Sequence, residues 1–456
     1  MFQIKKDNNL TKISLAIVLL VYFFLRFYLI EQRIIFGWDQ ARDAQVVSQI
    51  LSGKLTLIGP RVLGPDKFFL GPYFYYLLVS FYLITQGSPI AMIYFLTCYN
   101  LVFVSLFWLI IKKLFSEKVA LFALLLWAVN PSLVSNDIIS WNPVLVPLIV
   151  LAIWYLCWLI QAKKNNQFIY LFLGFVLGLG INFHFQMIFL VPFVILFFWF
   201  NKRVVNIKRI FLATAGFFVA FFPLFLFDLR HNFLNSRLFV KFFTGGQESK
   251  NILAWLPVLK NFISGFTGFN LSSLLALVLF ILLALAFFWK SKKECLNGFG
   301  RSFCLATSGL FLIILAGFSL YGARPSEYYF NFLIPFVIVF LADFLARRRF
   351  GQVIVFSIAL FWFSLTLNRL GPNPFSLASK MAAVNHLTAE LNQERVNVAF
   401  SVPPSEDSSY IYLINQAGYQ IDPSAGPQYT VVAPADREPV SVTVGNIGLI
   451  LPEKRN

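Results

Sequence analysis

The chain has 456 residues, of which 59% are hydrophobic, 18% aromatic and 12% charged. Soluble domains carry about 25% charged residues, so this composition excludes an ordinary globular protein. A net charge of +17 would favour nucleic-acid binding in a soluble chain, but the repeated apolar runs predict a multi-pass membrane protein whose basic residues collect in cytoplasmic loops. We therefore expect a lipid bilayer, and no nucleic acid, as its partner.

The N-terminal segment sets the expected orientation of the chain. Lys5, Lys6 and Lys12 precede an apolar run at about 13–30, which predicts a retained first span with a cytoplasmic N-terminus. The stretch 31–89 is then the first external loop. Its helical patterns predict amphipathic helices at the membrane interface.

A short apolar run within that loop, 71–85, is not expected to cross the membrane. It opens with Gly-Pro and is rich in Tyr, which is typical of an interfacial segment or of one that dips in and returns. A crossing here would place Lys112, Lys113 and Lys118 outside, against the usual bias of basic residues toward the cytoplasm.

The remaining apolar runs predict ten further spans, so about eleven transmembrane helices in all. Every later basic cluster then falls on the cytoplasmic side. Gly174 and Gly178, four residues apart, predict a close approach between two of the helices. The ten spans are expected at about 90–111, 119–135, 143–160, 168–183, 187–201, 210–228, 271–289, 302–321, 328–346 and 351–367.

The tail beyond the last span differs in composition. It is polar, and the stretches RVNVAFSV, YIYLI and YTVVAP alternate as strands do, while a helix is expected near 378–392. We predict a transmembrane domain over residues 1–368 and a small extracytoplasmic α/β domain over residues 369–456. The fold class is thus an all-α polytopic membrane protein with a small C-terminal α/β domain.

The best candidate for chemistry is the stretch DQARDAQVVSQILSGK in the first external loop. Its apolar residues recur at helical spacing, which predicts a surface helix that begins at Asp39. Asp43 follows four residues later, so the two carboxylates share a face. They could act as a general base or bind a divalent cation. The alternative is a helix-capping Asp39 on a solvated helix face.

Other polar residues are expected at the same external level. Each alone is more typical of an interfacial anchor or a helix cap. Together they are the side-chain types needed to bind the phosphate of a lipid next to a hydroxyl group that reacts. They are Lys67, Asp137, Asn142, His184, Gln186, Asp228, Arg230, His231, Arg324, Glu327, Tyr328 and Tyr329.

The order of these features resembles the GT-C glycosyltransferases. The first span, the acidic helix at Asp39 and the Gly-Pro stretch before a Tyr-rich segment resemble the branch that contains protein O-mannosyltransferases and the lipid A aminoarabinose transferase. FDLRHN and SEYYFNFLIP also look like stretches of bacterial members. The resemblance covers about 13–368. It implies inverting transfer of a sugar from a polyprenyl-phosphate carrier to an acceptor hydroxyl, at the outer face of the plasma membrane, as part of cell-envelope synthesis.

The resemblance also implies roles for individual residues. Asp39 matches the proposed catalytic base, and Gln40 replaces the acidic residue that follows it, so Asp43 is expected to compensate. The family's second acidic position corresponds to Asn142, with Asp137 five residues earlier. These departures leave a divalent cation an open question, and no other cofactor is expected.

The family's Lys-Pro lysine corresponds to Gly71, which leaves Lys67 as the nearby cation. A basic position after the fifth span corresponds to His184. The expected donor-phosphate contacts are His184, Arg230, His231, Arg324 and Lys67. The expected substrate contacts are Gln40, Arg42, Asn142, Asp137, Gln186, Glu327 and Tyr328. The donor sugar is not indicated, and the acceptor is left open as a glycan, a lipid or a protein.

Two other functions compete with sugar transfer of this kind. An O-antigen ligase or polymerase would have a different fold and use a basic external loop late in the chain. A lipid-linked oligosaccharide flippase or another transporter would be expected to show internal repeats and charges at the membrane midplane. Few ionisable residues fall within the expected spans. Arg26 and Asp343 are exceptions, and both lie near span ends, from which their side chains can reach the membrane surface.

Overall fold

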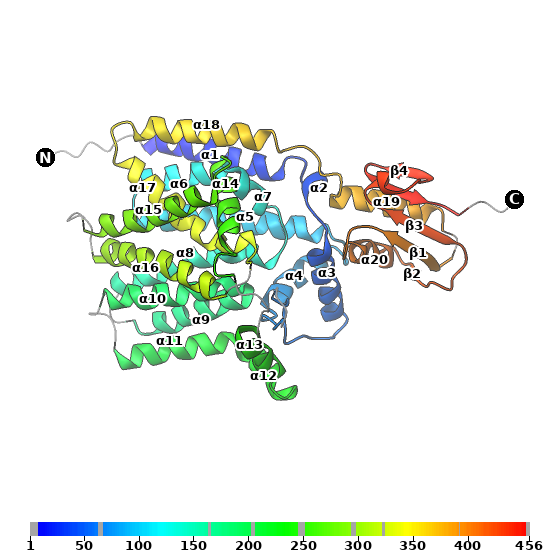
Figure 1. The fold of residues 1–456 in the computed structure, drawn as a ribbon, viewed down its shortest axis with the longest axis horizontal. Coiled ribbons are helices and arrows are strands. Elements are labelled where there is room, and N and C mark those ends of the chain that lie inside the picture. The colour runs from blue at the N-terminus through cyan, green and yellow to red at the C-terminus, as the bar shows by residue number, and fades with distance from the viewer. Residues whose placement is uncertain are drawn as a thin grey trace.

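The computed structural model describes residues 8–62, 67–162, 166–201, 206–244, 251–292, 298–321, 324–391 and 393–452. Long helices run side by side in one bundle, and a small sheet domain lies beyond one end of it (Figure 1). We call this end of the bundle the domain end and the opposite end the loop end.

The helical part contains the following elements: α1 (Asn8–Phe27), α2 (Ile30–Arg33), α3 (Trp38–Leu51), α4 (Tyr73–Ile84), α5 (Ala91–Leu114), α6 (Glu117–Val129), α7 (Pro131–Asn136), η1 (Asn142–Leu145), α8 (Val146–Ala162), α9 (Phe168–Phe183), η2 (Phe185–Phe189), α10 (Leu190–Trp199), α11 (Ile207–Ala220), α12 (Phe222–Arg230), α13 (Leu234–Thr244), α14 (Leu256–Thr267), α15 (Ser273–Ser291), α16 (Gly298–Tyr321), η4 (Glu327–Leu333), α17 (Ile334–Ala346) and α18 (Gly351–Leu367).

The bundle is that of a multi-pass membrane protein. Among the described residues, six helical stretches are long and apolar enough to cross a membrane, or seven if the pair α11–α12, bent by 57°, counts as one span. Shorter apolar helices include α9 and α18. Each expected span coincides with a helix or a helix pair. The membrane-protein class is confirmed, whereas the number of eleven spans stays a prediction.

Glycine permits the close packing of α9 against α11. A Cβ added to Gly174 would lie 1.7 Å from the carbonyl oxygen of Ala213, and one added to Gly178 would lie 2.6 Å from that of Phe217. A Cβ added to Gly216 of α11 would lie 2.0 Å from the carbonyl oxygen of Leu171. The predicted close approach at Gly174 and Gly178 is therefore confirmed.

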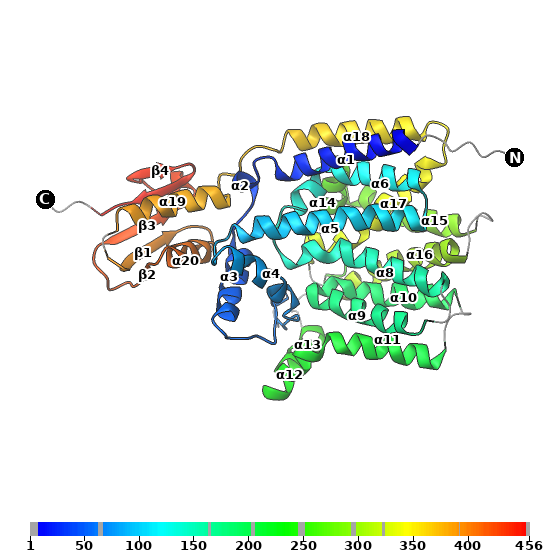
Figure 2. The same ribbon diagram turned by 180° about the vertical axis from the view of Figure 1, so that it is seen from behind.

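The helices of the first loop lie at the domain end. Figure 2 shows α3 and α4 next to each other there, between the bundle and the sheet domain. Twelve residues of α4 extend about 18 Å, short of a bilayer core of about 30 Å. Its Phe74, Tyr75, Leu78 and Tyr82 are buried. The geometry of α4 agrees with a segment that does not cross.

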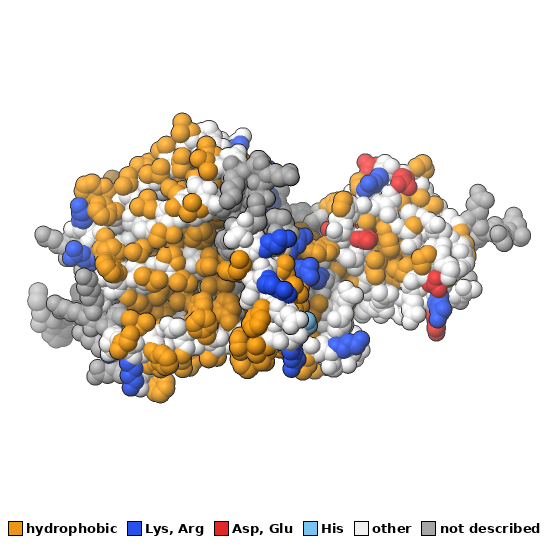
Figure 3. Space-filling view, turned by 60° about the horizontal axis from the view of Figure 1, so that its bottom comes forward, with side chains coloured by type: hydrophobic (Ala, Val, Ile, Leu, Met, Phe, Trp, Pro, Cys, Tyr) orange, Lys and Arg blue, Asp and Glu red, His pale blue; other side chains and the backbone are white. Residues whose placement is uncertain are grey.

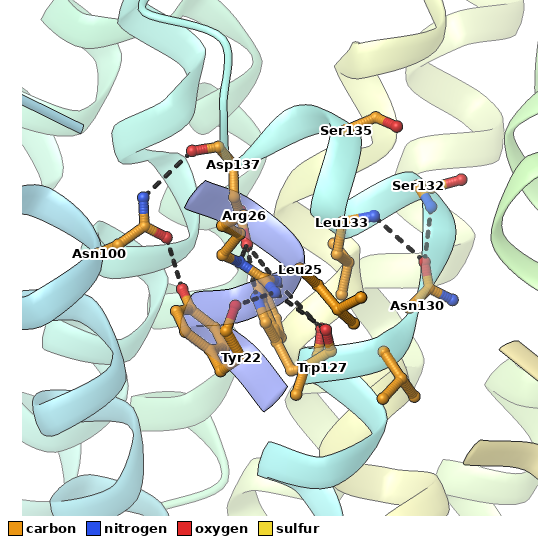
Figure 4. Close-up of polar contacts among 12 residues, drawn as sticks. Tyr22, Leu25, Arg26, Asn100, Trp127, Asn130, Ser132, Leu133, Ser135 and Asp137 are labelled. Atoms are coloured by element: carbon orange, nitrogen blue, oxygen red, sulfur yellow. Dashed lines mark hydrogen bonds and ion pairs between the residues drawn. The ribbon is translucent and has the colours of Figure 1, made fainter. Parts of the chain in front are cut away.

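Two charges expected to reach the membrane surface are instead buried within protein. Arg26 is fully buried, and its Nη2 lies 2.6 Å from Oδ2 of Asp137. Figure 4 shows this pair surrounded by Tyr22, Asn100 and Trp127. Asp343 is also buried and pairs with Lys290 and Arg347 at the loop end. The expectation for Arg26 and Asp343 was wrong because each side chain forms an ion pair inside the protein, and this pairing offsets the cost of burying the charge.

The C-terminal domain is a five-stranded sheet with two helices. Strand order is β2-β1-β3-β5-β4, with β1 parallel to β2 and β3, and β5 antiparallel to β3 and β4. These features confirm the predicted fold class. Its elements are α19 (Leu377–Ala389), β1 (Arg395–Ser401), α20 (Asp407–Gln416), β2 (Gln420–Ile421), β3 (Gln428–Val432), η5 (Ala435–Arg437), β4 (Val442–Val444) and β5 (Ile447–Ile450).

One predicted strand of this domain was wrong. RVNVAFSV and YTVVAP supply β1 and β3, but YIYLI forms the middle of α20. Tyr410, Leu413 and Ile414 are buried at helical spacing, so a 3.6-residue period fits the burial better than the two-residue alternation that we expected.

The sheet domain is attached to the segment that leads into α3. Lys380 of α19 is buried, and its Nζ donates to the carbonyl oxygen of Phe36, to Glu406 and to Ser409. The hydroxyl of Tyr412 donates to the carbonyl oxygen of Gly87 (2.7 Å). The domain therefore contacts both ends of the first loop.

Candidate active site

The start of α3 is fixed by Gln40. Its Oε1 accepts a hydrogen bond from the Gly37 N–H (3.1 Å), and its Nε2 donates to the carbonyl oxygen of Ser140 (3.0 Å). Both the oxygen and the nitrogen of this buried side-chain amide therefore form hydrogen bonds with backbone groups. Gln40, expected as a substrate contact, instead connects α3 to the turn between α7 and η1.

Asp39, Arg42 and Asp43 form one cluster on α3, as their spacing predicts. Arg42 Nη1 lies 2.6 Å from Oδ1 of Asp39, and Nη2 lies 2.6 Å from Oδ1 of Asp43. The two carboxylates differ in environment, because the Asp39 side chain is 40% exposed and that of Asp43 only 2%. Asp39 can therefore meet a substrate, whereas Asp43 holds Arg42.

The burial of Asp43 changes its acidity. Loss of hydration raises the pKa of the Asp43 carboxyl to about 7, against the opposing effect of Arg42, and Asp39 adds to the rise. Oδ2 of Asp43 is buried without a hydrogen-bond partner among the described residues. Tyr75 of α4 lies within electrostatic range of both Asp43 and Arg42.

A strongly basic cavity of about 460 Å³ opens beside this cluster. We call it the basic cavity. Figure 3 shows Lys and Arg side chains gathered between the apolar bundle and the sheet domain. Among the described residues that line the cavity, four are cationic and none is acidic, while Trp38, Phe69 and Tyr75 supply aromatic walls. The cations are Arg42, Lys54, Arg61 and Lys67.

Sequence reasoning found Lys67 but missed Arg61 and Lys54. An antiparallel bridge between Arg61 and Phe69 folds the loop back on itself and brings Arg61 near Lys67. The guanidinium of Arg61 lies 4.4 Å from the ring centre of Phe69. The paired Gly-Pro steps at both ends of this loop were the available signal for such a hairpin.

Gly71, at the family's lysine position, has no room for a side chain. A Cβ there would lie 2.2 Å from Oδ1 of Asn182. A cation at this level must therefore come from elsewhere in the loop, as Lys67 and Arg61 do.

A second polar cavity of about 270 Å³ lies at the same end of the bundle. We call it the polar cavity. Glu327 lines it and accepts a hydrogen bond from Nδ2 of Asn261 (2.8 Å). Tyr328 also lines it, contacts the ring of Trp141 edge-on, and lies within electrostatic range of Asp39 and Arg42. Tyr328 thus lines the polar cavity and lies within electrostatic range of the carboxylate cluster.

His184 and Gln186 are buried behind Tyr328. The His184 ring packs edge-on against Tyr328 and Tyr329, and its Nδ1 accepts from the Gln186 N–H. Burial lowers the pKa of His184 to about 3, so the ring is neutral at pH 7. It would not supply the positive charge that we expected. The side-chain amide of Gln186 is buried, and its Nε2 and Oε1 have no hydrogen-bond partner in the described part of the chain.

Asp137 and Asn142 make internal contacts. The Asp137 carboxylate accepts from Arg26 and from Nε1 of Trp127, so it faces the buried pair. Asn142 donates to the carbonyl oxygen of Phe183. Both were expected as substrate contacts because their turn is external, but the turn directs their side chains into protein.

The remaining basic candidates lie apart from the cluster. Arg230, His231 and Arg324 are exposed, and none lines either cavity as described here. Asp228 of FDLRHN accepts from the Asn235 and Ser236 N–H groups, and Asn235 binds the backbone of Phe69. Asp228 therefore positions Asn235, which in turn holds the backbone of Phe69 in the loop that lines the basic cavity.

The carboxylate cluster does not fit a divalent cation. Arg42 occupies the position between Asp39 and Asp43 that a cation would need. Among the described residues, no group of three or more His, Cys, Asp or Glu side chains is placed to hold a metal ion. Positive charge at this site comes from Arg and Lys.

Comparison with known proteins finds one family model that matches part of the chain and several solved structures that share its fold. A family model described as dolichyl-phosphate-mannose-protein mannosyltransferase matches residues 70–227, which begin just before α4 and end in α12. No curated protein matches the chain by sequence.

Solved structures show the fold over nearly the whole chain. ArnT from Cupriavidus metallidurans, bound to undecaprenyl phosphate, is 12% identical, with 97% of this chain and 98% of that chain covered and a TM-score of 0.52. The Archaeoglobus fulgidus oligosaccharyltransferase in the apo form is 13% identical, with 90% and 64% covered and a TM-score of 0.52. The O-antigen ligase alternative, which required a different fold, is not supported.

Proposed function

We propose that this protein transfers a sugar from a polyprenyl-phosphate carrier to an acceptor hydroxyl, with inversion, at the outer face of the plasma membrane. One observation carries the proposal: an accessible carboxylate, Asp39, is held by Arg42, and Arg42 lines a basic cavity at one end of the helical bundle.

The basic cavity is the proposed donor-phosphate site. Arg61, Lys54, Lys67 and Arg42 supply positive charge for a phosphate that gains charge as it leaves. ArnT is bound to undecaprenyl phosphate and the archaeal oligosaccharyltransferase AglB to a dolichol-phosphate, which supports a lipid phosphate here. We assign no direct phosphate contact to His184, Arg230, His231 or Arg324, since His184 is neutral and the others lie outside the cavity.

Asp39 is the proposed general base. Arg42 engages its Oδ1, and no hydrogen bond to its Oδ2 is found within the described structure. The acceptor oxygen attacks the anomeric carbon as the bond to the phosphate oxygen breaks, and Asp39 accepts the hydroxyl proton. Polyprenyl phosphate leaves with the electron pair. A single displacement of this kind inverts the anomeric centre.

The test removes the base without changing the shape of the side chain. Cells that lack this protein are complemented with wild type, Asp39→Asn or Asp436→Asn, and cell-envelope glycans are compared by mass spectrometry. Wild type and Asp436→Asn, a change at an exposed residue of η5, should restore the missing glycan. Asp39→Asn should lower it by roughly 100-fold or more, as loss of a general base does.

Full restoration by Asp39→Asn would remove Asp39 from the role of base. Membrane insertion of each variant is checked by its amount in the membrane fraction and its unfolding temperature in detergent.

A further inference from the structure

The polar cavity has the composition of a site for a neutral sugar or polyol. Trp141 contributes an aromatic ring to its lining, while Asn136, Asn261, Asn331 and Glu327 contribute amide and carboxylate groups. Aromatic surface combined with a few convergent polar groups is typical of small-molecule sites. Glu327 and Arg369 are the two charged residues of its described lining, so their formal charges cancel.

An apolar cavity of about 390 Å³ adjoins the polar cavity. The two share Phe262, Phe266 and Ile334 in their walls. Aromatic and aliphatic side chains of α14, α15, α17 and α18 line the apolar cavity, with Thr267 as the polar exception among its described walls. Such a lining suits hydrocarbon.

The apolar cavity reaches from the domain end toward the middle of the bundle. Val337 and Leu341 lie three and seven residues into α17, and Leu283 lies ten residues into α15. A rise of about 1.5 Å per residue gives depths of about 5, 11 and 15 Å. Half the hydrocarbon thickness of a bilayer is about 15 Å, so a lipid chain from one leaflet fits this depth.

Charge separates the two substrates. A phosphate favours the basic cavity, whose described lining carries four cations, over the polar cavity, whose described lining carries the carboxylate of Glu327 and a single cation, Arg369. The donor therefore takes the basic side of Asp39. The second substrate approaches from the other side, past Tyr328.

On the basis of the proposed function, we propose that the polar and apolar cavities together bind the acceptor, and that the acceptor is a membrane lipid with an uncharged glycosyl or polyol head group. Its chain occupies the apolar cavity, and its head group lies against Trp141 and Glu327. One head-group hydroxyl then points past Tyr328 to Asp39.

Photo-crosslinking tests the proposal without catalysis. Full-length Asp39→Asn protein in phosphatidylcholine nanodiscs is exposed to a monoglycosyl diacylglycerol with a diazirine in its acyl chain, and labelled residues are mapped by mass spectrometry. Labels should concentrate in α14 and α17. Val337→Trp fills the apolar cavity and should lower this labelling roughly tenfold, since excluding two methylenes has that effect. Glu327→Gln should lower it severalfold.

Val191→Trp is the matched control. Val191 lines a separate apolar groove between α9, α10 and α11, so labelling of α14 and α17 should be unchanged. Labels spread evenly over the lipid-facing helices, or unaffected by Val337→Trp, would overturn the proposal. So would a photoactivatable undecaprenyl phosphate that labels α14 and α17 in place of the glycolipid. Because binding is measured, a failure here is distinct from a failure of Asp39 in the glycan assay.

Discussion

At the scale of residues, one arginine separates two carboxylates with different tasks. Asp39 is accessible, while Asp43 is buried and receives two hydrogen bonds from Arg42, from Nε and Nη2. Environments that set neighbouring carboxyls apart are typical of sites with divided roles. Asp43 therefore orients Arg42.

The buried position of Asp43 predicts a pH-dependent stability. Its pKa is about 7 in the folded protein and near 3.8 when unfolded, so the folded state binds more protons between these values. The free energy of unfolding should then fall as pH rises from 4 to 7, by at most about 1.4 kcal/mol per pH unit. Unfolding temperatures of wild type and Asp43→Asn in detergent, measured from pH 4.5 to 7.5, test this.

The difference between wild type and Asp43→Asn is the informative quantity. It should favour wild type most at pH 4.5 and shrink toward pH 7.5. A difference that grows with pH would mean that the Arg42 ion pair outweighs burial. Asp436→Asn serves as the control for an exposed carboxyl.

Sequence alone could predict contacts within one helix but not contacts across the bundle. The cluster of Asp39, Arg42 and Asp43 follows from a spacing of three and four residues. The pair Arg26–Asp137 joins residues 111 apart, and no local pattern indicates it. Arg61 was missed for a related reason, because the loop hairpin brings it to the cavity.

At the scale of elements, hydropathy predicted which segments form apolar helices, since spans must bury their backbone bonds in helices. It did not predict α20. Within the small domain, Tyr410, Leu413 and Ile414 are buried, while Ile411 and Tyr412 are half-buried, so a short apolar alternation had two interpretations. Hydropathy also could not predict the contact between the sheet domain and the segment that leads into α3.

That contact predicts an effect of Lys380→Met. The change removes the donor for Phe36, Glu406 and Ser409, at a cost of about 1–3 kcal/mol for each buried group left without a partner. Limited proteolysis should release the sheet domain faster, and glycan restoration should fall because the segment before α3 is less fixed. Arg437→Met, at an exposed position, should do neither. Unchanged proteolysis of Lys380→Met would show that the domain is held mainly by other contacts.

At the scale of the whole molecule, charge is distributed between the two ends of the bundle. Lys290, Asp343 and Arg347 meet at the loop end, and Lys118 donates to the carbonyl oxygen of Ala346 there. Loops far apart in sequence thus gather their basic residues on one side. The cavities and Asp39 lie at the other end, with the sheet domain. From this gathering of basic loops we predict that the loop end lies in the cytoplasm.

Cysteine labelling tests that orientation. In a chain whose native cysteines are replaced by serine, Asp436→Cys marks the sheet domain and Gln352→Cys marks the loop end of α18; both positions are exposed. A membrane-impermeant maleimide should label Asp436→Cys in intact cells and Gln352→Cys only after the membrane is opened. The reverse pattern would place Asp39 in the cytoplasm, and transfer at the outer face would then be ruled out. Sidedness thus decides which pool of carrier lipid the basic cavity can meet.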